Sequence, residues 1–433
     1  MGEPVEIKPL VDHLFRHESG KLVAILIRIF GTEHIELAED VVQDSLFEAL
    51  DQWRYNGVPG NPSGWLFRVA KNKALNILER KKYQRNYVNQ VSNNLRSEPS
   101  TGSETDFFSN RGIQDDQLRM IFTCCHPAIS PDSQIALALK TLCGFSIAEI
   151  AKAFLTTEEN INKRLVRARQ NIRDAKIPFE IPHGKELDKR LNTVLETIYL
   201  LFNEGYSASK GNEVVRYELC EEAIRLAQIV LDNNIFDNKE NVHALLALMF
   251  LNASRFKARQ DAEGNLFTME QQDRSLWDKQ MRAIGLFHLG EASKNESIGI
   301  YHILAAISAQ YSIANDYEST DWKNILSLYD SLIQLDKSPV VLLNRAIVVS
   351  KVRGSKGALA ELEKIKHDPS LKNYYLFHFT QAEFFKELNE FANAVASLEK
   401  AIELAPLQSE KELFRKKLDA ARKNLSGTGT IRR

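Results

Sequence analysis

The chain has 433 residues, of which 44% are hydrophobic and 26% are charged. This length predicts roughly two to four domains, and the composition excludes a chain that is disordered throughout. The formal net charge is −1, so any nucleic-acid-binding surface must be a local concentration of basic residues. Four cysteines without a CxxC pair, no secretory leader and no apolar run of membrane-spanning length predict a cytoplasmic protein with no membrane association.

The segment AEDVVQDSLFEAL, from Ala38 to Leu50, predicts a helix with one apolar stripe. Its other face combines an aromatic ring with carboxylates, as protein interfaces often do. A solvated acidic face, with Phe47 packed under a neighbouring helix, is an equally good interpretation. The stripe expected to be buried consists of Ala38, Val42, Ser45 and Ala49, and the outer face consists of Asp40, Gln43, Asp44, Phe47 and Glu48.

Glycines and prolines from Gly57 to Gly64 predict a shaped loop, after which a helix is expected from Trp65 to about Arg85. One face should bury Leu66, Ala70, Ala74 and Ile77. The opposite stripe suits base-edge hydrogen bonding, stacking and phosphate neutralisation. An ordinary surface helix rich in lysine and arginine is the alternative. The stripe consists of Trp65, Arg68, Asn72, Asn76 and Arg80, with Lys73 beside it.

Residues 86–114 are dominated by Asn, Ser, Thr, Gly and charged residues, and they predict a linker that becomes ordered only on binding. Two helix-start signals follow in close succession, Ser146 with Glu149 and Thr156 with Glu159. Helices joined so tightly predict a helix-turn-helix, although a plain helical hairpin with a solvated basic face also fits the pattern.

The second helix of this pair, from Thr157 to Ala175, sorts into two faces at helical spacing. Its outward face is suited to reading a DNA groove. The apolar face consists of Ile161, Leu165, Ala168 and Ile172, and the outward face of Glu159, Lys163, Val166, Arg167 and Gln170.

Pro178 and Pro182 interrupt the helical pattern, after which residues 183–425 form the largest helical block and residues 426–433 a frayed tail. Small and bulky residues recur there at the offsets of a tetratricopeptide repeat, which predicts a degenerate helical solenoid whose concave face binds a protein or peptide. Packing of the repeats on the preceding domains is the alternative. The residues at these offsets are Ala382, Phe385, Ala394, Leu398, Ala401 and Pro406.

The sequence contains no nucleophile–base set, glycine-rich phosphate loop or convincing metal cluster, so neither an enzyme nor a cofactor or metal site is expected. Cys124, Cys125 and His126 lack the spacing of metal ligands, and the two thiols are expected to be buried. A capping and ion-pair role at a helix start is expected for Asp273, Arg274, Trp277 and Asp278, and an active site is the alternative.

These segments occur in an order that resembles the extracytoplasmic-function class of bacterial RNA polymerase sigma factors, in the sigma-70 family. AEDVVQDSLFEAL is similar to the region-two helix that binds the polymerase clamp, and NPSGWLFRVAKNKALNILERKK to the helix that melts and reads the minus-ten element. CGFSIAEIAKAFLTTEENINKRLVRARQNIR is similar to region four, and the resemblance covers about the first 180 residues. DDQLRMIFTCCHPAIS, IYLLFNEGYSAS and DRSLWDKQ are similar to signatures of a subgroup with a long C-terminal helical-repeat extension.

The resemblance implies an all-α factor that directs core RNA polymerase to promoters. Its implied parts are region two in residues 1–85, the linker in 86–114, region four in 115–177 and a tetratricopeptide-like extension in 183–425. The implied partners are promoter DNA, the β' clamp and β flap of core RNA polymerase, and a protein or peptide regulator on the extension. The linker would run through the polymerase, and the extension would hold the factor in an active or inactive state.

The resemblance also assigns roles to residues. The clamp-binding motif corresponds to Asp40, Gln43 and Asp44, with Phe47 beside them, and the loop from Gly57 to Gly64 to one that holds a flipped base. Asn162 stands where many relatives have a basic residue, so the resemblance does not imply which minus-35 sequence this chain prefers. The helix on the melted minus-ten element corresponds to Trp65, Asn72, Lys73, Asn76 and Arg80, the groove-facing positions of region four to Asn162, Lys163, Val166 and Arg167, and flanking positions near phosphates to Arg164 and Arg169.

Two other classes of protein share part of this pattern. A stand-alone helix-turn-helix regulator with a tetratricopeptide-type interaction domain explains the groove-reading helix but not the surfaces before it. A repeat scaffold explains only the C-terminal block. The acidic face and the basic stripe favour the sigma factor, because only that class needs both.

Overall fold

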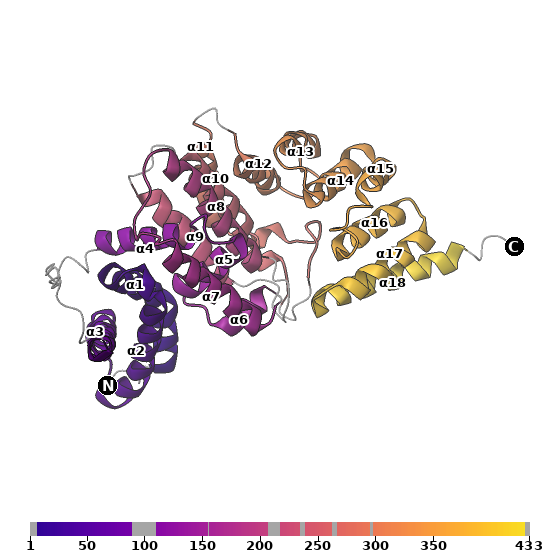
Figure 1. Ribbon diagram of the computed structural model, residues 1–433. Coiled ribbons are helices and arrows are strands. Elements are labelled where there is room, and N and C mark those ends of the chain that lie inside the picture. Colours follow the sequence, from indigo (N-terminus) through magenta and orange to yellow (C-terminus); the bar gives the residue numbers. More distant parts are fainter. Residues whose placement is uncertain are drawn as a thin grey trace, which may run out of the picture. The chain divides into compact units, whose positions relative to one another are not determined.

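The computed structural model describes residues 7–88, 110–154, 156–206, 217–233, 239–261, 266–294 and 298–428. Helices dominate these residues and no strand lies among them, which confirms the all-α prediction. The chain divides into two compact units, Met1–Leu200 (unit one) and Leu201–Arg433 (unit two), and Figure 1 labels their helices. Within the described ranges, no helix is both long and apolar enough to span a membrane.

Unit one begins with α1 (Ile7–Phe30), a short η1 (Thr32–His34), α2 (Ile35–Asn56) and α3 (Pro62–Val88). The middle helix, α2, packs against both α1 and α3. The buried sides follow the predicted helical periodicity, except that Ile77 is only partly buried. The predicted positions that are buried are Ala38, Val42, Ser45 and Ala49 on α2 and Leu66, Ala70 and Ala74 on α3.

The helix predicted to begin at Trp65 begins at Pro62 instead. Proline is well suited to a first helical position, because the N–H that it lacks would have no partner within the helix. Asn61 precedes it, and its Oδ1 accepts a hydrogen bond from the Gly64 N–H at 2.9 Å, as a helix cap does. The loop after α2 is therefore shorter than the predicted span from Gly57 to Gly64.

The expected linker, residues 86–114, is helical at both of its described ends. The preceding helix, α3, continues to Val88, and α4 begins at Asn110. Residues 89–109 lie outside the described residues. Unit one continues with α4 (Asn110–Cys124), α5 (Pro131–Thr141), α6 (Ile147–Ala153), α7 (Glu158–Asp174) and the start of α8 (Lys185–Tyr206).

Both predicted helix starts of the helix-turn-helix are present, one of them shifted by a residue. The Glu149 N–H donates to Ser146 Oγ at 3.1 Å and the Ser146 N–H to Glu149 Oε2 at 2.8 Å, which completes the predicted capping box of α6. At α7 the cap is Thr157 rather than Thr156, because Thr157 has the extended backbone of a cap and its Oγ1 accepts from the Asn160 N–H at 3.2 Å.

The division between the compact units falls inside α8, whereas the sequence suggested a boundary at residue 183. The reason is that the first part of α8 is bonded to α4 and the residue after it. The guanidinium of Arg190 donates to the Phe122 carbonyl oxygen, and the Cys125 thiol lies 3.6 Å from Thr197 Oγ1. Burial raises the pKa of Cys125 to about 11, so this thiol is neutral near pH 7.

Unit two is a succession of packed helices (Figure 1). Consecutive helices pack in pairs, α14 with α15 and α16 with α17. At the predicted repeat offsets, Ala382 and Leu398 are buried, whereas Phe385 is only partly buried and the adjacent Phe384 fills the core. The helices are α9 (Tyr217–Asp232), α10 (Glu240–Ala253), α11 (Lys279–Ala292), α12 (Ile300–Ile313), α13 (Trp322–Leu335), α14 (Pro339–Arg353), α15 (Ser355–Ile365), α16 (Tyr375–Glu387), α17 (Phe391–Leu404) and α18 (Gln408–Thr428).

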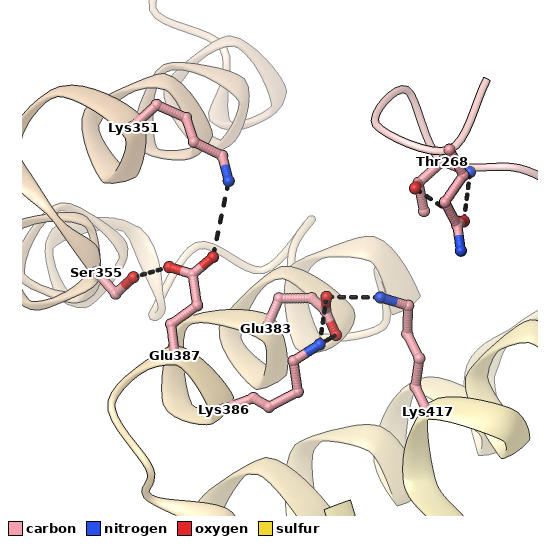
Figure 2. A network of polar contacts seen from close by, with 8 residues as sticks. Thr268, Lys351, Ser355, Glu383, Lys386, Glu387 and Lys417 are labelled. Atoms are coloured by element: carbon pink, nitrogen blue, oxygen red, sulfur yellow. Dashed lines mark hydrogen bonds and ion pairs between the residues drawn. The ribbon is translucent and has the colours of Figure 1, made fainter. Parts of the chain in front are cut away.

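Polar contacts join α16 to its neighbours (Figure 2). Glu387 accepts a hydrogen bond from the Ser355 hydroxyl at the start of α15 and lies 3.7 Å from the Lys351 ammonium group of α14. Glu383 pairs with the Lys417 ammonium group of α18 at 2.6 Å. These contacts join α16 to α14, α15 and α18, and each exposed pair adds at most about 1 kcal/mol of stability.

His243 of α10 and His288 of α11 face each other, with their Nδ1 atoms 2.8 Å apart. One nitrogen must donate and the other accept, so the contact requires at least one neutral imidazole. Burial is the main reason that the pKa of His288 is lowered to about 4; a charge on His243 lowers it further, and Glu291 opposes the shift.

We expect unit two to lose up to about 3 kcal/mol of unfolding free energy as the pH falls from 6.5 to about 4. The unfolded chain takes up a proton on His288 near pH 6.5, whereas the folded chain does so only near pH 4. The contribution of neutral His288 to stability is therefore complete above pH 6.5 and is lost as the pH falls to about 4. His288→Gln should flatten this part of the pH profile of thermal unfolding. His367→Gln, which removes an exposed histidine of unit two, should not; equal slopes in both variants would contradict the assignment.

Candidate polymerase and DNA interfaces

The outward face of α2 exposes the predicted polymerase-binding residues. Gln43 and Asp44 are exposed, and Phe47 is 61% exposed, which rules out the interpretation that its ring packs under a neighbouring helix. Asp40 is also exposed; partial burial of its carboxyl, and next the nearby Glu36 carboxylate, raise its pKa. An exposed phenyl ring beside carboxylates provides an apolar anchor with a polar surround for another protein. We call Asp40, Gln43, Asp44 and Phe47 the α2 patch.

The polar stripe of α3 lies mostly in solvent. Arg68, Asn72, Asn76 and Arg80 are exposed, at spacings that place them along one side of the helix. Trp65 is only partly exposed, because its ring packs edge-on against the buried Trp53 with centroids 5.4 Å apart. The contact holds the Trp65 indole at the N-terminal end of the stripe. We call Trp65, Arg68, Asn72, Asn76 and Arg80 the α3 stripe.

Lys73 joins α3 to α2 rather than extending the stripe freely into solvent. Its ammonium group lies 2.8 Å from Glu48 Oε2 and donates to the carbonyl oxygen of Asp44 at 3.0 Å. In this arrangement Lys73 holds α3 against the part of α2 that carries the α2 patch. A phosphate contact by Lys73 would require these bonds to break.

The outward face of α7 is exposed as predicted, and its apolar face is buried. Val166 is 56% exposed, an unusual setting for an aliphatic side chain in the middle of a helix. Lys163 pairs with Glu159 at 2.7 Å, an exposed contact that a phosphate could replace at little cost. The exposed side chains are Glu159, Asn162, Lys163, Val166, Arg167 and Gln170, and the buried ones are Ile161, Leu165, Ala168 and Ile172.

The two arginines predicted to flank the exposed face of α7 are themselves only partly exposed. Arg164 lies 3.2 Å from the Asp132 carboxylate of α5 and is partly exposed. Arg169 turns towards α2, where its guanidinium binds the Glu39 carboxylate and lies 3.5 Å from Glu36. Arg169 is thus engaged within the protein in this structure, and a phosphate contact by Arg169 would require these bonds to break.

Glu39 is the centre of a cluster that joins α2 to the helix-turn-helix. It is 7% exposed, it binds Arg169, and it accepts a hydrogen bond from the Thr141 hydroxyl at 2.6 Å. We call Glu36, Glu39, Thr141 and Arg169 the α2–α7 cluster. Removing one partner from such a buried ion pair is costly, because it leaves a charge without compensation.

Other contacts reinforce this packing within unit one. Asp116 of α4 is fully buried between Arg28 of α1 at 3.1 Å and Arg119 at 2.8 Å. Burial raises the pKa of Asp116 to about 6, although both arginines oppose the shift. In addition, a Cβ on Gly20 would overlap the carbonyl oxygen of Leu142, so α1 approaches the end of α5 closely enough to require glycine.

The position of Glu39 in the sequence indicates the α2–α7 cluster, although the predicted helical faces did not include this residue. Glu39 lies between the buried Ala38 and Val42, so a carboxylate falls on the apolar side of α2. Buried carboxylates need a partner, but the partner lies far along the chain and no local spacing identifies it. In the described parts of the chain, no group of three or more His, Cys, Asp or Glu side chains could hold a metal ion.

Comparison with known proteins identifies the families that the chain matches. The chain matches the families Sigma-70 region 2 over residues 14–83, Sigma-70 region 4 over residues 119–172 and a family of unknown function (DUF6596) over residues 190–293. A protein of Rhizobium meliloti (strain 1021), described as uncharacterized protein R00370, is 37% identical over 395 residues, covering 91% of this chain and 92% of the relative. No solved structure matches the chain significantly. The chain belongs to the sigma-70 family, as an extracytoplasmic-function type sigma factor with a C-terminal extension.

Proposed function

We propose that this sigma factor binds the β' clamp of core RNA polymerase through the α2 patch. The observation that carries the proposal is an exposed Phe47 beside the carboxylates of Asp40 and Asp44. A clamp surface with a hydrophobic pocket and basic rim would bury the ring and pair with the carboxylates. The β flap would contact region four, which we place in residues 115–177.

The α3 stripe is proposed to hold the melted minus-ten strand. Strand opening costs stacking and pairing energy, which protein contacts to unstacked bases offset. The stripe supplies amide groups for base edges from Asn72 and Asn76, guanidinium groups for phosphates from Arg68 and Arg80, and an aromatic ring from Trp65. The loop before α3 is proposed to receive a flipped base.

The exposed face of α7 is proposed to read the minus-35 element in the major groove. Arg167 suits guanine, Asn162 and Gln170 suit adenine, and Val166 suits the thymine methyl group. Each good bidentate contact contributes about 1 to 3 kcal/mol of discrimination. Lys163 and Arg164 would contact phosphates and make the affinity depend on salt.

Use of both DNA surfaces together requires the α2–α7 cluster to open. Elements centred near positions −10 and −35 are separated by about 25 base pairs, or about 85 Å of duplex. In the cluster, Arg169 of α7 binds Glu39 of α2 directly, so α3 and α7 cannot span that distance. Binding to polymerase would offset the lost contacts.

Run-off transcription with full-length protein, core RNA polymerase and a promoter library tests this function. Stoichiometric binding to core enzyme and initiation at defined start sites are expected. Sequence-specific DNA binding without polymerase association would instead indicate a stand-alone regulator. A chain that ends after Leu200, the end of unit one, keeps the contacts of Arg190 and Thr197 in α8 and removes the extension. Unchanged transcription would contradict a regulatory role.

Asn72→Ala should reduce open-complex formation about tenfold, because one bidentate base contact is lost. Core-polymerase affinity should not change, since Asn72 is exposed and lies outside the α2 patch. Permanganate footprinting of the melted strand measures the first effect, and co-purification with core enzyme the second. Asn393→Ala, an exposed asparagine of unit two, is the control. Equal loss of melting and core binding would indicate misfolding and count against the assignment.

A further inference from the structure

Unit two contains a pocket that the proposed function does not use. It has a volume of about 450 Å³ and lies between η4 (Arg274–Leu276), the first turns of α11 and the end of α12. Arg274, Trp277, Arg282 and Ser312 line it, together with the exposed Ile313 and Asn315. This volume is within the range of roughly 300 to 1,000 Å³ that small-molecule sites occupy.

Two buried polar atoms of the lining have no hydrogen-bond partner. They are Nε1 of Trp277, whose side chain is 3% exposed, and Oγ of Ser312, which is 1% exposed. An indole N–H can only donate, and a buried polar group without a partner costs about 1 to 3 kcal/mol. Both side chains line the same pocket, so a ligand with acceptor oxygens could satisfy them together.

The charge of the lining also favours an anion. Burial lowers the pKa of Arg274, whose guanidinium donates to the carbonyl oxygens of Tyr311 at 2.7 Å and Ala314 at 2.6 Å and is thereby held in place. The Arg282 guanidinium has a longer contact, 3.3 Å, to the Ser312 carbonyl oxygen. Arg255 adds a further positive charge, with its guanidinium 5.7 Å from the centre of the Trp277 ring.

The carboxylates near this pocket do not line it, and each accepts a hydrogen bond from a backbone N–H group. Asp273 accepts from the Ser275 N–H at 2.8 Å, Asp278 from the Gln280 N–H at 2.9 Å, and Asp316 from the Ser319 N–H at 2.7 Å. Asp316 in addition acts on Arg274, whose pKa it raises against the effect of burial. The expected capping and ion-pair role of this cluster therefore does not account for the two donors without a partner, Trp277 Nε1 and Ser312 Oγ.

We propose that this pocket binds a small organic anion through a carboxylate or phosphate group. The anionic oxygens accept hydrogen bonds from Trp277 Nε1 and Ser312 Oγ, and Arg282 and Arg274 supply the compensating charge. Such charge-assisted bonds are stronger than those between neutral groups. The pocket lies wholly within unit two.

Isothermal titration of the full-length protein at constant ionic strength tests the proposal. The probes are inorganic phosphate, AMP, succinate and citrate, with adenosine as an uncharged control. Saturable binding of at least one anion and none of adenosine is expected. Tighter binding of AMP than of the dicarboxylate and tricarboxylate identifies a phosphate site, and the reverse order a carboxylate site. No saturable binding by any of the four anions would overturn the proposal.

Two variants separate ligand binding from folding. Arg282→Gln should weaken binding at least tenfold, whereas Arg353→Gln, an exposed arginine of α14, should not change it. Ser312→Ala should weaken binding several-fold and yet leave the unliganded melting temperature unchanged or higher, because it removes an unpaired hydroxyl. Ser350→Ala removes a hydroxyl that donates to the Ile347 carbonyl oxygen and should lower stability without affecting binding. Equal effects of Arg282→Gln and Arg353→Gln on affinity would overturn the assignment of the site.

Discussion

Asp44→Arg should weaken the affinity for core RNA polymerase at least tenfold, about 1.4 kcal/mol, while the fold remains intact. Asp44 is exposed, so the substitution alters no packing. Its charge lies in the α2 patch one turn before Phe47, where a basic partner surface would be repelled by arginine. Fluorescence titration of labelled core enzyme with the full-length variant measures the effect.

Asp51→Arg is the matched control for this charge reversal. Asp51 is also an exposed aspartate of α2, two turns further along, and lies outside the α2 patch. Its reversal should leave core affinity within about twofold, because single surface charges away from an interface contribute little. Equal losses in the two variants would show that general charge, and not the α2 patch, determines binding.

Arg169→Ala should lower the free energy of unfolding of unit one by about 3 kcal/mol or more. Glu39 would keep only the Thr141 hydroxyl as a partner for a carboxylate that is 7% exposed. Lys163→Ala breaks an exposed pair on the same helix and should cost less than about 1 kcal/mol. Hydrogen exchange of the α2 and α7 amides during chemical unfolding reports on this unit, whereas tryptophan fluorescence would also include Trp277 and Trp322 of unit two.

A double variant distinguishes the ion pair from a general loss of packing. Replacing both Arg169 and Glu39 by methionine removes the buried charges together, and the stability should return to within about 1 kcal/mol of the original. Hydrogen exchange of the α2 and α7 amides should rise in Arg169→Ala and fall back in the double variant. If Arg169→Ala costs no more than Lys163→Ala, the α2–α7 cluster does not hold the two helices together.

Helical periodicity alone predicted the surfaces of α2 and α7 well. On each helix the apolar positions recur at the helical repeat, so the buried and exposed sides follow once a helix forms. Ala38 and Ala49 on α2 and Ile161 and Ile172 on α7 are buried as this argument requires. Periodicity did not decide whether the ring of Phe47 is exposed or packs under a neighbouring helix, because both interpretations were equally consistent with the sequence.

Positions where two segments meet were predicted less well. Lys73 has the composition and spacing of a DNA-contacting residue, yet its ammonium group binds Glu48 and the carbonyl oxygen of Asp44. Arg169 is predicted to lie near phosphates, and in this structure it binds Glu39. Local spacing specifies which side of its own helix a long basic side chain leaves from, but not which carboxylate from another helix comes within reach.

The sequence by itself determined the all-α class and the buried and exposed sides of α2 and α7, because these depend on short-range periodicity, capping and turn residues. The order of sigma-70 regions two and four followed from the resemblance of its motifs to that family. The tertiary structure decided that Arg169 pairs with Glu39, that the compact units divide within α8, and that Trp277 and Ser312 line one pocket. These features arise from contacts between residues far apart in the chain. Such contacts form only when the packing of whole helices brings them together, so no local pattern encodes them.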